Sequence, residues 1–128
     1  MTLELWLLIA SAGLCWTLII AAATPNLLSD PVWAAGNRDT EAPASEVVKR
    51  MGRVAENMKE NLPFFAIVVI VVHLADSSNW LSTLGAEIFV GARVVHAIVY
   101  ILGVPWLRTG IWAVSIVGIG MMVATLFM

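Results

Sequence analysis

The stretch WLSTLGAEIFVGARVVHAIVYILG, residues 80–103, decides the fold of this chain. As a helix it is about 36 Å long, which is enough to cross a hydrocarbon core of about 30 Å. Arg93, His96 and Tyr100 lie in it at spacings of three and four residues, which place them on one face of a helix. A positive charge at membrane depth is costly unless it has a partner or a function. The stretch therefore predicts a transmembrane helix with one polar face.

The composition is that of an integral membrane protein. The 128 residues are 60% hydrophobic and 12% charged, with a mean hydropathy of +0.90. Soluble domains are about 45–50% apolar and about 25% charged. The net charge of −2 gives no indication of a nucleic-acid partner. Cys15 is the only cysteine, which excludes an intramolecular disulfide and a cysteine-based metal cluster, and no metal site is expected.

The predicted fold class is all-α, with residues 1–128 forming a single transmembrane four-helix bundle. The expected helices cover residues 3–23, 46–75, 80–103 and 106–127. No basic region precedes the first apolar run, which favours a retained helix over a cleaved leader. The turn-forming residues 24–26 are expected to end this helix. Ser45 is a predicted N-cap for the second helix.

The basic residues lie on one side of the predicted bundle, toward the loops formed by residues 24–45 and 103–106. They are Arg38, Lys49, Arg50, Arg53, Lys59, Arg93 and Arg108. The positive-inside rule places both loops in the cytoplasm and both termini on the opposite side. A short chain with minimal loops is typical of a bacterial protein, and we expect it in the inner (plasma) membrane.

A polar stripe precedes the apolar part of the second helix. Residues 62–75 would span only about 21 Å, so the preceding polar residues must enter the membrane. Spacings of three and four residues place these on one face that cannot contact lipid: Arg50, Arg53, Asn57 and Glu60. Counted from the turn at residues 76–79, Glu60 and Arg93 lie at similar depth.

Arg108 opens the fourth predicted helix at the same end, so the sequence predicts one net-basic cavity near the cytoplasmic face. The cavity would be lined by the second, third and fourth helices. Arginine side chains bind carboxylates through two parallel hydrogen bonds, and they lower the pKa of a nearby thiol. Such a cavity suits a small anionic ligand that carries an amine.

Structural alternatives stand beside this hypothesis. Arg93 and Glu60 could form a pair that only ties helices together. His96 could be a packing residue, and Tyr100 an aromatic anchor at the membrane interface. Small multidrug transporter subunits also have four short helices, but they use a carboxylate in the middle of the first helix. This chain has only Glu4 there, at the helix end.

Two motifs together resemble the MAPEG family, the membrane-associated proteins in eicosanoid and glutathione metabolism. They are RMGRVAENMKENLPFF (residues 50–65) and ARVVHAIVYILGVPWLRTG (residues 92–110). The family pattern has Arg, Asn four residues later and then Glu on the second helix, with Arg, His and Tyr on the third and an Arg at the head of the fourth. The resemblance implies a homotrimer with glutathione, as cosubstrate, between adjacent subunits near the cytoplasmic face.

The resemblance also implies roles for individual residues. Arg108 matches the arginine that stabilises the glutathione thiolate, and it is the expected catalytic residue. Arg50 and Thr109 are additional candidates for the site, while Glu56 and Glu87 receive no assigned role. The implied glutathione-binding residues are Arg53, Asn57, Glu60, Arg93, His96 and Tyr100.

The function expected from the resemblance is that of a membrane-bound glutathione transferase or glutathione-dependent peroxidase. A lipophilic small-molecule substrate would enter from the surrounding membrane lipids. The alternative is a non-catalytic membrane protein that binds lipid or another thiol, or that forms a subunit of a larger membrane complex.

Overall fold

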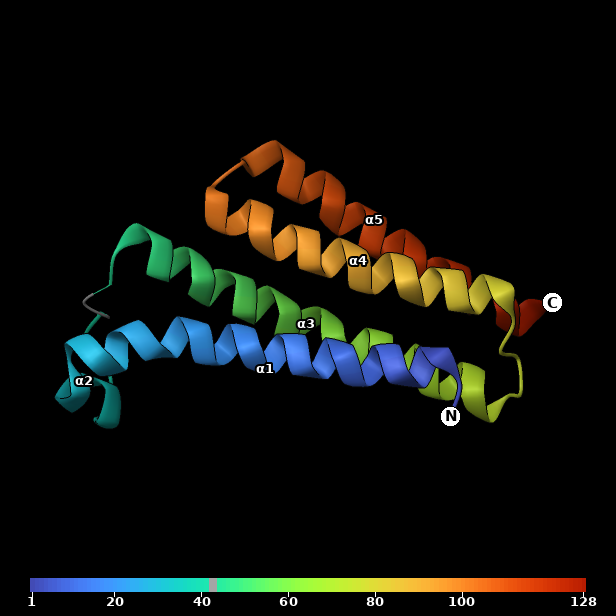
Figure 1. Cartoon of the computed structure of the whole chain (residues 1–128), viewed down its shortest axis with the longest axis horizontal. Coiled ribbons are helices and arrows are strands. Elements are labelled where there is room, and N and C mark those ends of the chain that lie inside the picture. Colours follow the sequence, from blue (N-terminus) through green and yellow to red (C-terminus); the bar gives the residue numbers. More distant parts are fainter. Residues whose placement is uncertain (42–43) are drawn as a thin grey trace.

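A computed structural model of the chain describes residues 1–41 and 44–128. Four long helices alternate in direction and bring both termini to one end (Figure 1): α1 (Leu3–Ser29), α3 (Glu46–Leu74), α4 (Trp80–Leu102) and α5 (Pro105–Ala124). A short helix, α2 (Pro31–Ala35), lies at the other end, and the 3-10 turn η1 (Thr125–Phe127) follows α5. All four long helices are long and apolar enough to cross a membrane. The predicted fold class, an all-α integral membrane four-helix bundle, is confirmed.

Local capping sets where the helices begin and end. Ser45 is the N-cap of α3, as predicted, and its hydroxyl accepts a hydrogen bond from the third residue of the helix. Asn79 caps α4 in a reciprocal box, because its side chain and that of Ser82 each accept a bond from the other's backbone N–H. Gly103 ends α4 with φ of 80°, a left-handed conformation that suits glycine. These signals keep the turns on both sides of α4 short.

The first helix is longer than the sequence predicted. The expected end at residues 24–26 is wrong, because α1 continues through Pro25 to Ser29. A proline removes only one hydrogen bond of the helix, and the hydroxyl of Thr24 donates to the carbonyl of Ile20 at 2.7 Å nearby. The helix ends at Ser29, and its C-cap Asp30 is non-helical, because helical geometry is disfavoured for a residue that precedes proline. The predicted loop at residues 24–45 therefore contains the last turn of α1 and the whole of α2.

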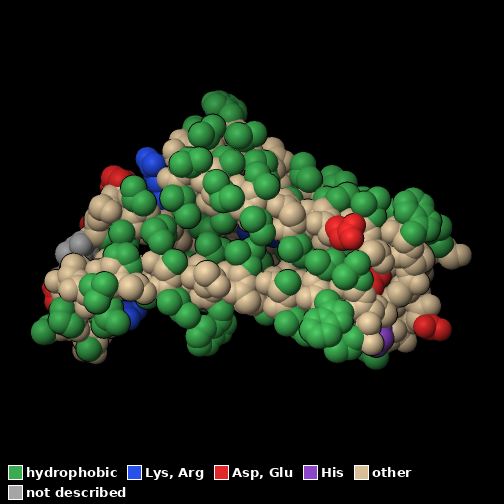
Figure 2. Space-filling view, in the orientation of Figure 1, with side chains coloured by type: hydrophobic (Ala, Val, Ile, Leu, Met, Phe, Trp, Pro, Cys, Tyr) green, Lys and Arg blue, Asp and Glu red, His purple; other side chains and the backbone are tan. Residues whose placement is uncertain are grey.

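The hydrophobic core lies in the half of the bundle near the termini. Phe65 of α3 stacks on Phe89 of α4 with ring centroids 4.0 Å apart, and Val69, Val72, Ala86 and Met122 are fully buried around them. The opposite half, near α2, holds the polar residues of the predicted site. Hydrophobic side chains are spread over the whole face in Figure 2 with few charged groups among them, as expected of a surface that contacts lipid.

Candidate functional site

Arg93 is buried between α3 and α4, with only 2% of its surface exposed. One terminal nitrogen of its guanidinium donates a hydrogen bond of 2.6 Å to Oδ1 of Asn57. Its Nε and Nη1 have no hydrogen-bond partner among the described residues. The ion pairs found in residues 1–41 and 44–128 join Lys49 and Lys59 to nearby glutamates, and none involves Arg93. Within the described chain, Arg93 is thus held by an amide and not by Glu60.

A polar cavity of about 180 Å³ opens beside this bond. Residues of α3, α4 and α5 line it: Asn57, His96, Tyr100, Arg108, Thr109 and Trp112. The guanidinium carbon of Arg108 lies 4.6 Å from the centre of the Tyr100 ring. His96 meets the same ring edge-on, with centroids 5.6 Å apart. The structure therefore brings five of the predicted site residues to one cavity.

Trp112 was missed from the sequence, although a signal for it was present. It follows Arg108 by four residues and Thr109 by three, which places all three on one face of a helix. The indole supplies an apolar wall beside the polar groups. A mixed wall of this kind suits a ligand with one polar and one apolar part.

Arg53 and Glu60 do not line this cavity. Both are exposed on α3, in register with Asn57 at spacings of four and three residues. The polar stripe of α3 thus reaches the cavity only at Asn57, and Arg53 and Glu60 open onto the surface of the subunit. Glu87 of α4 is also exposed. Charged groups exposed at membrane depth are costly in lipid unless something covers them.

Arg50 serves the connection between helices. Its Nη1 donates to the carbonyl oxygen of Ile101 at 3.4 Å, at the C-terminal end of α4. It also lies so close to Gly103 that a Cβ on that glycine would be 2.5 Å from the same nitrogen. A cation at the C-terminus of a helix interacts favourably with the helix dipole. The geometry of Arg50 is that of a tie between α3 and α4.

Glu56 lies away from this cavity. Its carboxylate accepts a hydrogen bond from Lys59, one turn along α3, and both line a second cleft between α1 and α3. The cavity at Arg108 therefore has no lining carboxylate among the described residues. Its charged lining residue is a cation, which favours an anionic ligand.

The family of the chain follows from a comparison of its sequence with family models. The model of the MAPEG family matches residues 6–128. The chain belongs to the MAPEG family. The match includes α3, α4 and α5, all of α1 except its first three residues, and every residue that lines the cavity of this MAPEG protein. No curated protein and no solved structure matches the chain.

Proposed function

We propose that this MAPEG protein is a membrane-bound glutathione transferase or glutathione-dependent peroxidase that acts on lipophilic electrophiles. Family membership supports a link to glutathione. The observation that carries the proposal is the cavity in which Arg108 lies over the ring of Tyr100. A fixed cation and hydrogen-bonding groups on membrane-spanning helices suit a reaction between a polar thiol and an apolar substrate.

The cavity residues offer complementary groups to the tripeptide. Glutathione carries two carboxylates, an amine and a thiol. Because Oδ1 of Asn57 accepts from Arg93, the amide N–H₂ of Asn57 is left to donate toward the cavity. The hydroxyl of Thr109 and the ring of His96 add further polar contacts. In this proposal Arg93 acts as a positioning residue that fixes the orientation of Asn57.

Arg108 is the proposed catalytic residue. A guanidinium beside the glutathione sulfur lowers the pKa of the thiol and stabilises the thiolate, which is the nucleophile. In conjugation, the thiolate forms a carbon–sulfur bond and the electrophile releases its leaving group or takes up a proton. With a hydroperoxide, the sulfur attacks the peroxide bond, and a second glutathione completes the disulfide, giving the alcohol and water.

The proposal includes a homotrimer whose subunits complete the site. A cavity of about 180 Å³ is smaller than the roughly 300–1,000 Å³ typical of small-molecule sites. Arg53 and Glu60 lie exposed beside it and would be costly against lipid. A neighbouring copy packed on this surface would cover both residues and enlarge the site, with Glu60 available to the glutathione amine. The number three comes from the family resemblance.

In the proposed orientation, the end of the bundle that carries α2 faces the cytoplasm. The membrane would be the inner membrane of a bacterium. Arg38, Lys49, Arg50 and Arg108 belong to the loops and helix ends on this side, whereas both termini lie at the other end (Figure 1). The positive-inside rule supports this orientation. The cavity would then open toward the compartment that contains reduced glutathione.

Turnover by the purified protein tests the proposal. A chromogenic electrophile and a lipid hydroperoxide are each supplied with glutathione, to wild type and to Arg108→Ala and Arg108→Lys. We expect Arg108→Ala to lower kcat/KM by at least tenfold, or about 1.4 kcal/mol in transition-state stabilisation. Lys49→Ala is the matched control, since Lys49 lies outside the cavity and pairs with glutamates.

Glutathione titration by calorimetry separates the proposal from its alternative. Binding without turnover favours a non-catalytic MAPEG protein, and absence of both heat and thermal stabilisation excludes a glutathione site. An unchanged rate in Arg108→Ala contradicts the proposed mechanism even if glutathione binds.

A further inference from the structure

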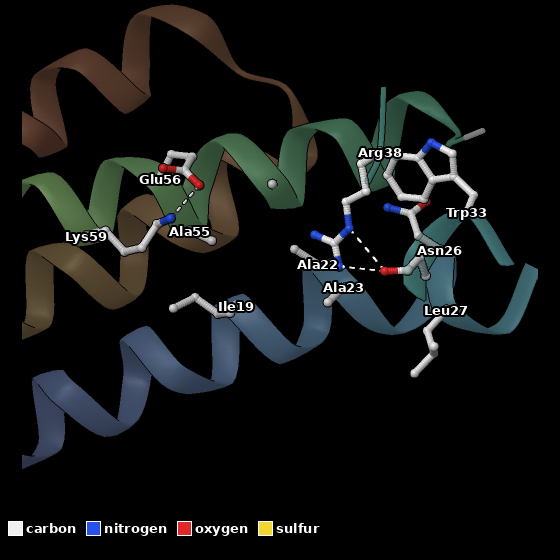
Figure 3. A pocket seen from close by; sticks show the side chains of 12 residues that line it. Ile19, Ala22, Ala23, Asn26, Leu27, Trp33, Arg38, Ala55, Glu56 and Lys59 are labelled. Carbon is white, nitrogen blue, oxygen red and sulfur yellow. Dashed lines mark hydrogen bonds and ion pairs between the residues drawn. The ribbon is translucent and has the colours of Figure 1, made fainter. Parts of the chain in front are cut away.

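A second cleft lies between α1, α2 and α3, with a volume of about 310 Å³ (Figure 3). Its lining shares no residue with the cavity at Arg108. The lining from α1 is mostly small or aliphatic, and the charged groups come from α3 and from Arg38. The lining includes Ile19, Ala23, Trp33, Arg38, Gly52 and Lys59.

Helix length places the cleft across the expected boundary between the hydrocarbon core and the lipid headgroups. Counted from Leu3 at 1.5 Å per residue, Ile19 lies about 24 Å along α1, Ala23 about 30 Å and Asn26 about 35 Å. A hydrocarbon core is about 30 Å thick. The lining of the cleft therefore begins below the end of the apolar run of α1 and continues beyond it. A molecule in this cleft would have one part in hydrocarbon and one part in the polar interface.

The charges of the cleft are fixed by the fold. Nε and Nη2 of Arg38 both donate to the carbonyl oxygen of Ala34, at 3.1 and 3.0 Å, which leaves the Nη1 edge of the guanidinium free of those bonds. Arg38 also lies 5.6 Å from the ring of Trp33, whose Nε1 donates to the carbonyl of Thr40 at 3.0 Å. These contacts hold Arg38 in place before any ligand binds, which reduces the entropy cost of binding.

Lys59 supplies the second cation, and its long stem allows the ammonium to extend from membrane depth toward the interface. Glu56 accepts one hydrogen bond from it. The cleft therefore holds two cations and one carboxylate, a net charge of +1. Figure 3 shows the guanidinium of Arg38 between α1 and α3, and the ammonium of Lys59 turned toward the Glu56 carboxylate on α3. This charge complements a phosphate ester.

The room in the cleft comes from small side chains. Ala22 and Ala23 of α1 face Gly52 and Ala55 of α3 across it. A Cβ added to Gly52 would meet nothing within 4 Å. These small side chains form an apolar floor, with Ile19 at the end nearest the middle of the membrane. Such a floor suits an acyl chain or a glycerol backbone more than a water-soluble anion.

We propose that this cleft binds an anionic phospholipid of the leaflet at the α2 end. Its phosphate would contact Arg38 and Lys59, and its acyl chain would run along α1 past Ala23 and Ile19. Charge, depth and the apolar floor select this ligand together. The site is separate from the proposed glutathione site, so the two proposals can fail independently.

The test is native mass spectrometry of the full-length protein in its oligomeric form, with phosphatidylglycerol and phosphatidylcholine of identical acyl chains. We expect the wild type to retain at least threefold more phosphatidylglycerol. Arg38→Gln and Lys59→Gln should each reduce this preference, and the double variant should abolish it. Lys49→Gln, which removes a cation of α3 outside the cleft, is the matched control and should retain the preference.

Gly52→Leu provides an independent variant, because the new side chain fills the cleft and leaves its charges unchanged. It should reduce retention of phosphatidylglycerol, whereas Gly120→Leu, at an equally open helical position on α5, should not. A further arm adds glycerol phosphate without acyl chains, and competition by it at equal concentration would identify a soluble phosphate site instead. Equal retention of the two lipids, or equal loss in Lys49→Gln and Lys59→Gln, overturns the proposal.

Discussion

Arg93 donates a 2.6 Å hydrogen bond to Oδ1 of Asn57, and this bond joins α4 to α3 at the wall of the polar cavity. Arg93 is 2% exposed, and two of its guanidinium nitrogens have no partner in the described part of the chain. A buried cation held by one neutral amide is a costly arrangement. The free energy of unfolding should therefore depend strongly on Asn57.

Asn57→Ala should lower the free energy of unfolding by about 3 kcal/mol, because it leaves the Arg93 charge buried without its described partner. The measurement is unfolding by a denaturing detergent, followed by circular dichroism. Asn61→Ala is the matched control, since Asn61 lies one turn along α3 and donates only to the backbone carbonyl of Asn57.

The double variant Asn57→Ala, Arg93→Met should recover most of this loss, because the unpaired charge is then absent. A double variant less stable than Asn57→Ala alone would show that Arg93 stabilises the fold by other contacts. The same variants should lower glutathione affinity, since both lose the oriented amide of Asn57.

Tyr100 supports Arg108 through its ring, which lies 4.6 Å from the guanidinium carbon. Tyr100→Phe keeps this ring and should retain most glutathione-dependent turnover, whereas Tyr100→Leu removes the cation–π contact. That contact has a free energy of about 1–2 kcal/mol when desolvated, so kcat/KM should fall about 5- to 30-fold in Tyr100→Leu. A similar loss in both variants would assign the role to the hydroxyl instead of the ring.

Glu4 forms a buried polar cluster at the opposite end of the bundle from α2. It is 3% exposed and accepts hydrogen bonds from the hydroxyls of Ser82 at 2.6 Å and Thr83 at 3.0 Å. Its carboxylate thus lies at the N-terminus of α4, where a negative charge interacts favourably with the helix dipole.

Glu4→Ala should lower the free energy of unfolding by about 2 kcal/mol, because the hydroxyls of Ser82 and Thr83 lose a charged hydrogen-bond acceptor. Glu4→Gln keeps an acceptor oxygen and should lose less. Thermal unfolding in detergent measures both, with the exposed Glu46→Ala as the control. Equal midpoints for Glu4→Ala and Glu46→Ala would contradict a structural role for this cluster.

The sequence was sufficient for the four spans and for the face shared by Arg93, His96 and Tyr100. Both depend on hydrophobic length and helical period, which are local properties. Glu4 shows the limit, because its burial depends on contact with Ser82, seventy-eight residues away. The predicted end of α1 was wrong because residues 24–26, which often form a turn, continue the helix in this protein.

The direction in which the polar stripe of α3 faces is a second feature that helical periodicity alone could not predict. Spacing places Arg53, Asn57 and Glu60 on one face, but the stripe is wide enough to meet both the cavity and the subunit surface. The direction of the face depends on how α3 packs on α1 and α4. In the structure, Asn57 faces α4 and the other two are exposed.

Gly85 and Gly118 allow α4 and α5 to pack closely. A Cβ on Gly118 would lie 2.5 Å from the carbonyl oxygen of Gly85, and one on Gly85 would lie 2.6 Å from that of Gly118. Backbone atoms cannot give way as a flexible side chain does, so the helices would have to separate. Gly118→Ala should therefore lower the free energy of unfolding by about 2 kcal/mol, the typical cost of overpacking.

Gly120→Ala provides the contrast on the same helix, two residues away. A Cβ there meets nothing within 4 Å, so the change should be neutral or stabilise α5 by up to about 1 kcal/mol through helix propensity. Unfolding by detergent compares the two variants directly. Gly85→Ala and Gly118→Ala combined should cost less than the sum of the single changes, because one separation of the helices relieves both contacts. Strict additivity, or equal stability of Gly118→Ala and Gly120→Ala, would show that α4 and α5 do not meet at these glycines.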